Sequence, residues 1–253
     1  MNRIKDYEVL KNDIVKWLAD YYWMYSGNIK GFVVGVSGGI DSAVVSTLCA
    51  ETGLPTYVVT MPLHSKAENT ELSEAHAHGL VEKYHNVAMV NVDLTRTYDT
   101  MMTWLDDTFT GDELANANTK SRLRMTALDQ IAGARKCIVV GTGNKVEDYG
   151  IGFYTKYVDG GVDIAPIADL YKTEVWELGE VLGVDERICD APPTDGLWDD
   201  GRKDEDQIGA SYEQLEEAME HGTGPAVDIL DKFNRQNKHK MEPIPTFKLE
   251  KVR

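Results

Sequence analysis

The chain has 253 residues, 42% hydrophobic and 27% charged, so it can bury a full core without disulfides or a structural metal. Its 42 acidic and 26 basic residues give a formal net charge of −16, which argues against general nucleic-acid binding because such a surface repels phosphate backbones. No apolar run reaches the length of about 18 residues that a membrane-spanning helix needs, and the mixed-charge N-terminus lacks the apolar core of an export signal.

The first 140 residues alternate between helical and strand-like hydrophobic patterns. Residues 4–25 have helical spacing, and their aromatic end, residues 21–25, is apolar enough to predict burial in the core or against a second subunit. Short apolar runs predict strands over 32–36, 56–61, 87–92 and 137–140. Helical patterns cover 40–50, 67–84, 95–107 and 117–135. This alternation predicts an α/β fold, a doubly wound parallel sheet with helices on both faces.

The second half of the chain is less regular. Residues 149–166 are rich in Gly, Tyr and Asp and favour neither helix nor strand, whereas residues 171–182 return to a helical pattern. Residues 190–209 have the turn residues and clustered charges of a loop. A capping box at Ser211 predicts a short helix, and a last helix is expected over 225–238. We therefore expect one domain over 1–253 with a C-terminal helical elaboration.

The strongest chemical signal lies between the first predicted strand and the first helix that follows it. In that position, glycines let backbone N–H groups converge on an anion, and the helix N-terminus adds positive potential. The segment matches neither a Walker A loop nor a dinucleotide-binding fingerprint. Asp41 would repel a bound phosphate unless a cation lay between them, so it suggests Mg²⁺. The alternative is a glycine-rich turn without a ligand. The segment consists of Gly35, Val36, Ser37, Gly38, Gly39, Ile40, Asp41 and Ser42.

Residues 37–42, Ser-Gly-Gly-Ile-Asp-Ser, resemble the pyrophosphate loop of the N-type ATP pyrophosphatases, which split ATP between the α and β phosphates and adenylate a substrate. Later segments resemble the ammonia-dependent NAD synthetases within that group. These segments are Asn-x-x-x-Arg-x-Arg at 118–124, Gly-Thr-x-x-x-x-Glu at 141–147, Lys-Tyr-x-Asp-Gly-Gly-x-Asp at 156–163, Pro-Thr at 193–194 and His-Lys at 239–240. The resemblance covers residues 30–240; Val158 replaces the usual glycine, and residues 63–78 match poorly.

The resemblance implies a ligase that amidates deamido-NAD with ammonia and ATP, through an adenylated intermediate, and releases AMP and pyrophosphate. It assigns the ATP phosphates to the glycine-rich segment with Thr142, Lys172 and Thr194, and Mg²⁺ to Asp41 and Glu147. The residues that it assigns to deamido-NAD are Arg122, Lys156, Asp163, His239 and Lys240. It implies catalytic roles for Ser37, Lys172 and Asp159, with Asp159 orienting or deprotonating ammonia. No residue is assigned to the adenine base.

Each of these residues also has a purely structural interpretation. Arg122 and Arg124 could form a solvated helix face, and Asp159 could stabilise its own turn. Three other functions remain open: the synthetase part of a GMP synthetase, a tRNA-modifying adenylase and a non-catalytic nucleotide-binding regulator. The Asp-Gly-Gly-x-Asp segment argues against the first, and the negative charge and the lack of paired catalytic cysteines against the second. The presence of Asp41, Glu147 and Lys172 argues against the third.

The remaining expectations concern the surroundings of the protein. Cys49, Cys137 and Cys189 are far apart and form no CxxC pair, so we expect free thiols in a reducing cytoplasm. The chain has no room for a glutaminase domain outside the synthetase pattern, so ammonia is expected to enter directly or from a separate partner. The aromatic run at 21–25, together with the resemblance, predicts a homodimer.

Overall fold

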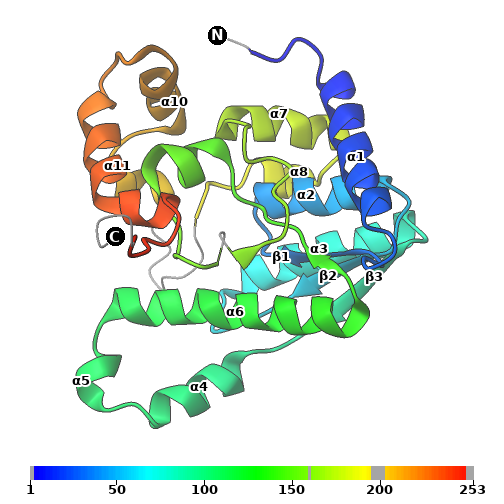
Figure 1. The fold of residues 1–253 in the computed structure, drawn as a ribbon, viewed down its shortest axis with the longest axis horizontal. Helices are drawn as coiled ribbons and strands as arrows, with labels where there is room; N and C mark the ends of the chain where they lie inside the picture. Colours follow the sequence, from blue (N-terminus) through cyan, green and yellow to red (C-terminus); the bar gives the residue numbers. More distant parts are fainter. Residues whose placement is uncertain (1–2, 159–160, 195–202, 249–253) are drawn as a thin grey trace.

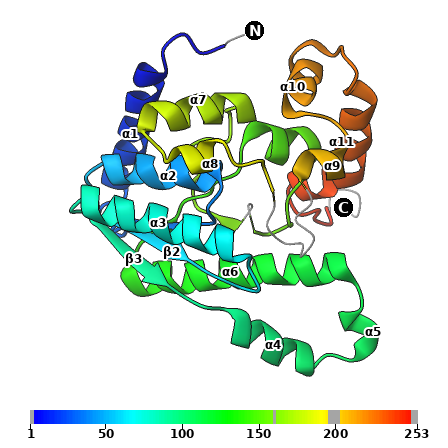
Figure 2. The same cartoon turned by 180° about the vertical axis from the view of Figure 1, so that it is seen from behind.

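A parallel four-stranded sheet with helices on both faces forms the centre of the molecule (Figures 1 and 2). The computed structural model describes residues 3–158, 161–194 and 203–248. The strands, in the spatial order β3-β2-β1-β4, are β3 (Val87–Asn91), β2 (Thr56–Thr60), β1 (Phe32–Val36) and β4 (Ile138–Val139). Because the strand order reverses between β1 and β4, the carboxyl ends of these strands border the crevice where such sheets bind ligands. The doubly wound α/β fold expected from the sequence is confirmed.

The alternation of side chains along β1 builds the two layers. Phe32 and Val34 are fully buried in a core with α1 (Tyr7–Met24), α2 (Ile40–Glu51) and α7 (Lys172–Leu182). Val33 is buried in a second core on the opposite face, with α6 (Glu113–Arg135). The continuous apolar run of β1 therefore reflects a strand covered on both sides.

The remaining helices of the first half follow the predicted order. α3 (Ala67–Lys83) packs on β2 and β3. The single helix expected over 95–107 is instead two, α4 (Thr95–Thr103) and α5 (Asp107–Thr110), because Asp106 caps a new helix by accepting a hydrogen bond from the Thr108 N–H. α4 and α5 extend away from the body of the molecule (Figures 1 and 2).

The C-terminal part forms a helical cluster with a core of its own. η1 (Val146–Ile151), a π-helical segment, packs against α10 (Tyr212–His221) and α11 (Val227–Met241), while α8 (Glu186–Cys189) and α9 (Asp204–Ile208) are short. The capping box at Ser211 is confirmed. The prediction of a loop over 190–209 is wrong at its C-terminal end, because α9 forms there. Residues 195–202 lie outside the described residues. Residues 149–166 are expected to favour neither helix nor strand, but the first three of them belong to the π-helical η1.

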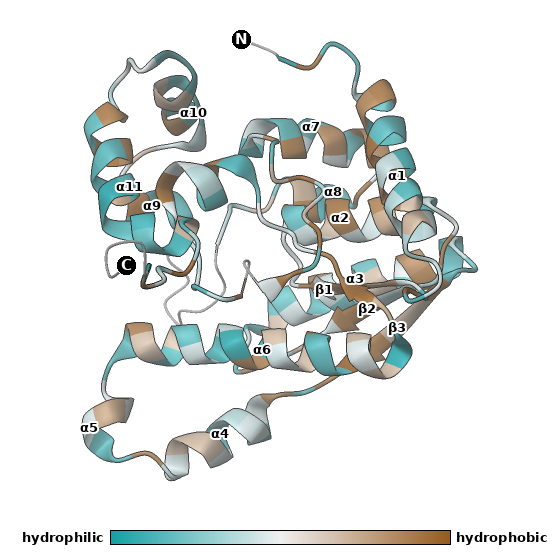
Figure 3. Ribbon diagram, in the orientation of Figure 1, coloured by the Kyte–Doolittle hydropathy of each residue, from teal (hydrophilic) through white to brown (hydrophobic). Residues whose placement is uncertain are grey.

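Hydrophobic residues are concentrated in the strands of the sheet (Figure 3). No helix in the described part of the chain is both long and apolar enough to cross a membrane. The aromatic run at the end of α1 is divided between the core and the surface. Tyr21 and Tyr22 pack against the core, whereas Trp23 and Met24 are 63% and 71% exposed within this chain. For those two residues, burial against a second subunit stays a prediction.

Candidate functional site

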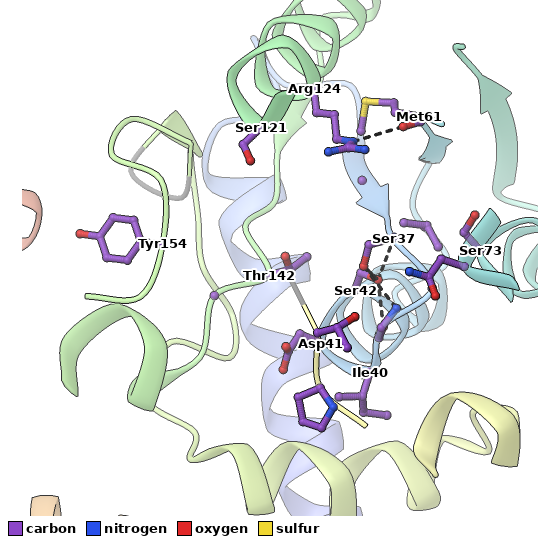
Figure 4. Close-up of a pocket in the computed structure, with 18 of the residues that line it drawn as sticks. Ser37, Ile40, Asp41, Ser42, Met61, Ser73, Ser121, Arg124, Thr142 and Tyr154 are labelled. Carbon is purple, nitrogen blue, oxygen red and sulfur yellow. Dashed lines mark hydrogen bonds between the residues drawn. The ribbon is translucent and has the colours of Figure 1, made fainter. Parts of the chain in front are cut away.

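A cavity of about 380 Å³ opens beside the carboxyl ends of β1 and β2 (Figure 4). Its lining joins segments that are far apart in the sequence. Residues 35–42 form one wall, and Thr142, Glu147, Lys172 and Thr194 contribute to the others. The cavity therefore contains all of the described residues that the sequence assigns to ATP and Mg²⁺.

Internal hydrogen bonds shape the loop after β1. The Ser42 hydroxyl donates to the Gly39 carbonyl at 3.0 Å and accepts from the Ser37 N–H at 3.1 Å, and the Gly39 N–H donates to the Ser37 hydroxyl at 3.2 Å. Gly38 has φ of 89°, and a Cβ at this position would lie 2.8 Å from the Asn69 carbonyl oxygen, so only glycine fits. The loop directs the N-terminus of α2 towards the cavity, as a phosphate site requires.

Three charged side chains from three different elements meet beside this loop. The Lys172 ammonium, at the start of α7, lies 2.5 Å from Asp41 Oδ2 and 3.0 Å from Glu147 Oε1. Asp41 belongs to the first turn of α2, and Glu147 to η1. Lys172 is only 3% exposed, so its charge is held almost entirely by the two carboxylates.

The two carboxylates have different environments. Burial raises the pKa of Asp41 to about 6, and the nearby charge of Glu147 adds to this effect, although Lys172 opposes it. Burial also acts to raise the pKa of Glu147, but Lys172 and the hydrogen bond from Tyr212 outweigh it and hold the pKa below its usual value. Burial acts to lower the pKa of Lys172, but the two carboxylates outweigh it and raise the pKa. Lys172 therefore remains a cation at neutral pH.

The backbone around Glu147 and Lys172 is held by polar side chains that no sequence motif identifies. The Asn144 side-chain oxygen accepts hydrogen bonds from the N–H groups of Val146 and Glu147, both at 3.1 Å. At the start of α7, the Thr173 N–H donates to Glu216 at 3.0 Å. Asn144 and Glu216 form no motif by themselves, so only the three-dimensional arrangement identifies them.

The residues present fit a magnesium ion. Asp41 Oδ1 is buried and has no hydrogen-bond partner among the described residues, although it belongs to a carboxylate that lines the cavity. Asp41 and Glu147 supply hard oxygen atoms, and Mg²⁺ is usually held by one or two carboxylates together with substrate phosphates. Among the described residues, no group of three or more acidic, His or Cys side chains could hold a metal ion.

The opposite end of the cavity is more apolar. Arg124 lies there beside Met61, whose carbonyl oxygen accepts a hydrogen bond from Arg124 Nε at 3.2 Å (Figure 4). Met125 and Leu128 from α6 also line the cavity. Burial lowers the pKa of Arg124, although its usual value is so high that the guanidinium remains charged. Arg124 is therefore part of the cavity lining and not of a solvated helix face.

The comparison with protein families identifies the family to which this fold belongs. The model of the NAD synthase family matches residues 10–246. The chain belongs to the NAD synthase family. Among curated members, it is 34% identical to the NH(3)-dependent NAD(+) synthetase of Finegoldia magna, over 97% of this chain and 98% of the relative. It is 37% identical to the enzyme of the same name from Carboxydothermus hydrogenoformans, over 93% and 95% of the two chains.

The solved structures that resemble this chain include one with a different name. The NMN synthetase of Francisella tularensis superposes with a TM-score of 0.86 and is 30% identical. The match covers 97% of this chain and 100% of that protein. The NH3-dependent NAD synthetase of Campylobacter jejuni has the same fold, with a TM-score of 0.75 and 22% identity over 96% of this chain and 100% of that one.

In this member of the NAD synthase family, the residues assigned by resemblance to the second substrate lie outside the cavity. Lys156 Nζ donates to the His239 carbonyl at 2.6 Å, and Lys240 Nζ donates at 2.9 Å to the carbonyls of Gly152 and Tyr154. These contacts bring Lys156, His239 and Lys240 together where η1 meets α11.

Two other assigned residues lie elsewhere. Arg122 is exposed on α6, and Asp163 Oδ2 accepts a hydrogen bond from the Val139 N–H at 2.7 Å. None of the five residues assigned to deamido-NAD, all of them described, lines the cavity. Asp159 lies outside the described residues.

Proposed function

We propose that this chain is an ammonia-dependent NAD synthetase, which amidates the nicotinate carboxylate of deamido-NAD and releases AMP and pyrophosphate. The observation that carries the proposal is the convergence of Lys172, Asp41 and Glu147 beside the glycine-rich loop. This arrangement suits a nucleotide whose α–β phosphate bond is to be broken, because a buried cation and two carboxylates lie next to the glycine-rich loop. Curated relatives that bear this name match nearly the whole chain.

The chemistry explains why ATP is needed. A carboxylate resists attack by ammonia because oxide is a poor leaving group. In the proposed reaction, a carboxylate oxygen of deamido-NAD attacks the α phosphorus of ATP, the α–β bond breaks and pyrophosphate leaves with the electron pair. Ammonia then attacks the acyl carbon, and AMP leaves. The Lys172 ammonium and the N-terminus of α2 would hold the phosphates and reduce the repulsion between two anionic substrates.

A magnesium ion held by Asp41 and Glu147 would polarise the phosphate oxygens when it is bound. Gly35 to Ser42, Thr142 and Thr194 would bind the rest of the triphosphate. The apolar end of the cavity, between Met61 and Leu128, is the proposed place of the adenine base, because a base can stack against apolar side chains there. Arg122, Lys156, Asp163, His239 and Lys240 remain proposals for the second substrate.

The function is tested by product analysis. The purified chain is incubated with ATP, Mg²⁺, ammonium and deamido-NAD, and we expect stoichiometric NAD, AMP and pyrophosphate. The absence of AMP and pyrophosphate would reject an adenylating ligase. Glutamine in place of ammonium is expected to give no product.

A second candidate substrate is the corresponding carboxylate mononucleotide. The NMN synthetase superposes over its whole length, and the five residues assigned to deamido-NAD lie outside the cavity. The same assay with the mononucleotide distinguishes the two substrates. A kcat/KM at least ten times higher for the mononucleotide would reject deamido-NAD as the preferred substrate.

Asp159 is proposed, from the sequence, to handle ammonia. Ammonium has no lone pair, so a nearby carboxylate that accepts its proton would produce the nucleophile. The variant Asp159→Asn is expected to release pyrophosphate normally but to amidate slowly, and the defect should shrink as pH or ammonium concentration rises. Equal loss of both steps, without rescue by ammonium, would instead indicate a structural turn residue.

We also propose a homodimer in a reducing cytoplasm. The three cysteines are free thiols, which agrees with such a compartment. The sequence bases the dimer on the aromatic run at 21–25, whereas in the structure the helices α4 and α5 and the start of α6 expose a second group of large apolar side chains. Such groups commonly mark protein interfaces. Trp104 is 85% exposed, and Phe109 and Leu114 are 67% and 61% exposed. We further propose that the chain is one domain, because the cavity takes its lining from both halves of the sequence.

The dimer proposal gives a test that separates two surfaces. A dimer through α4 and α5 should bury about 2,000 Å² or more. The variant Trp104→Asp is expected to produce a monomer in light scattering at micromolar concentration, whereas Trp23→Asp, on the exposed end of α1, should remain dimeric. The reverse result would place the interface on the aromatic end of α1, and a monomeric wild type would reject the dimer.

A further inference from the structure

Tyr212 is a buried tyrosine next to the charged cluster that the proposed reaction does not use. It is the first residue of α10, its side chain is fully buried, and it does not line the cavity. A buried hydroxyl is expected to have a specific partner, because an unpaired polar group in the core is costly. Here the partner is Glu147, whose Oε1 lies 2.8 Å from the Tyr212 hydroxyl.

The contacts of Tyr212 hold two of the three charged groups. Its hydroxyl and the Lys172 ammonium both donate to the same oxygen, Glu147 Oε1, so they fix the carboxylate from one side. The Lys172 ammonium also lies 5.3 Å from the centre of the Tyr212 ring, within the range of a cation–π interaction. One side chain therefore restrains both a proposed metal ligand and the cation that pairs with it.

The hydroxyl has a single hydrogen and two carboxylate neighbours. Asp204 Oδ2 is 3.3 Å away, farther than Glu147 Oε1 at 2.8 Å, so the shorter contact receives the hydrogen. Burial raises the pKa of Tyr212, and the negative charge of Glu147 adds to this effect. The hydroxyl therefore remains a donor.

The position of Tyr212 is itself rigid. Its ring packs edge-on against Trp176 of α7, with the ring centres 5.9 Å apart, and belongs to the core that joins η1, α10 and α11. Its backbone N–H donates to Glu205 at 3.1 Å. In contrast, Glu147 has a long side chain with many rotamers, and its segment η1 is a π-helical turn. The rigid Tyr212 hydroxyl therefore favours the one Glu147 rotamer that can accept its hydrogen bond.

We infer that Tyr212 is a positioning residue, which presets the Glu147 carboxylate and the Lys172 ammonium for the metal–nucleotide complex without touching the substrate. This inference rests on the proposed function for the identity of the nucleotide reaction. Partners that orient a metal ligand typically change metal affinity or activity by about 10- to 100-fold when they are lost.

The test uses Tyr212→Phe, which keeps the ring and removes only the hydroxyl. Binding of Mn²⁺ is measured by electron paramagnetic resonance with α,β-methylene-ATP, which cannot be split at the α–β position, and without a second substrate. We expect Mn²⁺ affinity to fall about 10-fold and kcat to fall by a similar factor. The KM for deamido-NAD should change less than twofold.

The matched control is Tyr84→Phe. Tyr84 also donates to a glutamate, Glu51 Oε1 at 2.9 Å, but it lies after α3 and outside the cavity. Tyr212→Phe should lower the melting temperature more than Tyr84→Phe, because Tyr212 is fully buried and Tyr84 is half-buried, but only Tyr212→Phe should alter Mn²⁺ binding. The inference is overturned if the two variants bind Mn²⁺ equally well and turn over equally fast.

One further measurement and the composition of the Mn²⁺ assay keep the inference testable. Incorporation of 3-fluorotyrosine at position 212 keeps the hydroxyl and should preserve Mn²⁺ affinity, even if Tyr212→Phe is too unstable to purify; a loss as large as that expected for Tyr212→Phe would count against the hydroxyl. The Mn²⁺ binding assay contains no deamido-NAD, so it does not depend on the proposed reaction. If the wild-type protein makes no NAD, the proposed function is rejected, and the Mn²⁺ affinities still decide the role of Tyr212.

Discussion

Replacing Asp41 by asparagine is expected to lower the rate of NAD formation at least about 100-fold, because it removes a charge that the proposed magnesium–ATP complex requires. The change keeps the size of the side chain. Burial raises the pKa of Asp41 to about 6, so folding disfavours its ionised form. The variant also breaks the buried pair between Asp41 and Lys172, but Glu147 still pairs with that ammonium, so it should lose less stability at pH 8 than a variant that removes Lys172.

The measurement combines steady-state kinetics at saturating Mg²⁺ with urea unfolding at pH 8. The matched control is Asp169→Asn, because Asp169 also pairs with a lysine, Lys145, at 2.7 Å but is 88% exposed and does not line the cavity. The control should keep nearly full activity. Near-normal turnover of Asp41→Asn would falsify the assignment of Asp41 to the metal–nucleotide site.

Replacing Lys172 by methionine is expected to damage both activity and stability. The rate should fall at least about 100-fold, because a buried cation no longer offsets the charge of the phosphates. Removing one partner of a buried ion pair typically costs about 3–5 kcal/mol, and here two carboxylates lose their partner. This variant should lose more stability at pH 8 than Asp41→Asn, because both carboxylates lose their partner.

The loss of stability in Lys172→Met should depend on pH in a definite direction. Without the ammonium, repulsion and burial raise the pKa values of Asp41 and Glu147 in the folded state above those in the unfolded chain. The folded state then binds more protons, so the stability of the variant falls as pH rises through the range of those raised pKa values. The deficit relative to wild type should therefore be smaller at pH 5 than at pH 8.

Urea unfolding at the two pH values measures this difference. Lys16→Met provides the control, because Lys16 pairs with Asp20 on the surface of α1, where both side chains are mostly exposed. Such a pair contributes about 0–1 kcal/mol, so its loss should be small at both pH values. A deficit for Lys172→Met that is equal at pH 5 and pH 8 would show that the carboxylates do not depend on Lys172.

The sequence by itself determined the alternation of strands and helices and the position of the glycine-rich loop. These features depend on local properties, namely hydrophobic period, caps and turn residues, which act over a few neighbouring positions. The run 32–36 predicts β1 with its correct bounds, and Ser211 predicts the start of α10. The family motifs added Thr142, Glu147 and Lys172, and the structure brings these three residues to one cavity.

Only the tertiary structure decided how these residues interact. Asp41 and Lys172 are separated by 131 positions, and no local pattern encodes their hydrogen bond or the burial that raises the pKa of Asp41. In the sequence, Tyr212 is recognisable only as the residue after the N-cap Ser211. Its approach to Glu147 depends on the packing of α10 against η1. Likewise, Asp204 lies in a polar, turn-rich stretch that predicts a loop, whereas the fold makes it the buried first residue of a short helix. Burial, charge pairing and the selection of one rotamer arise from contacts between distant segments, and those contacts exist only in the folded chain.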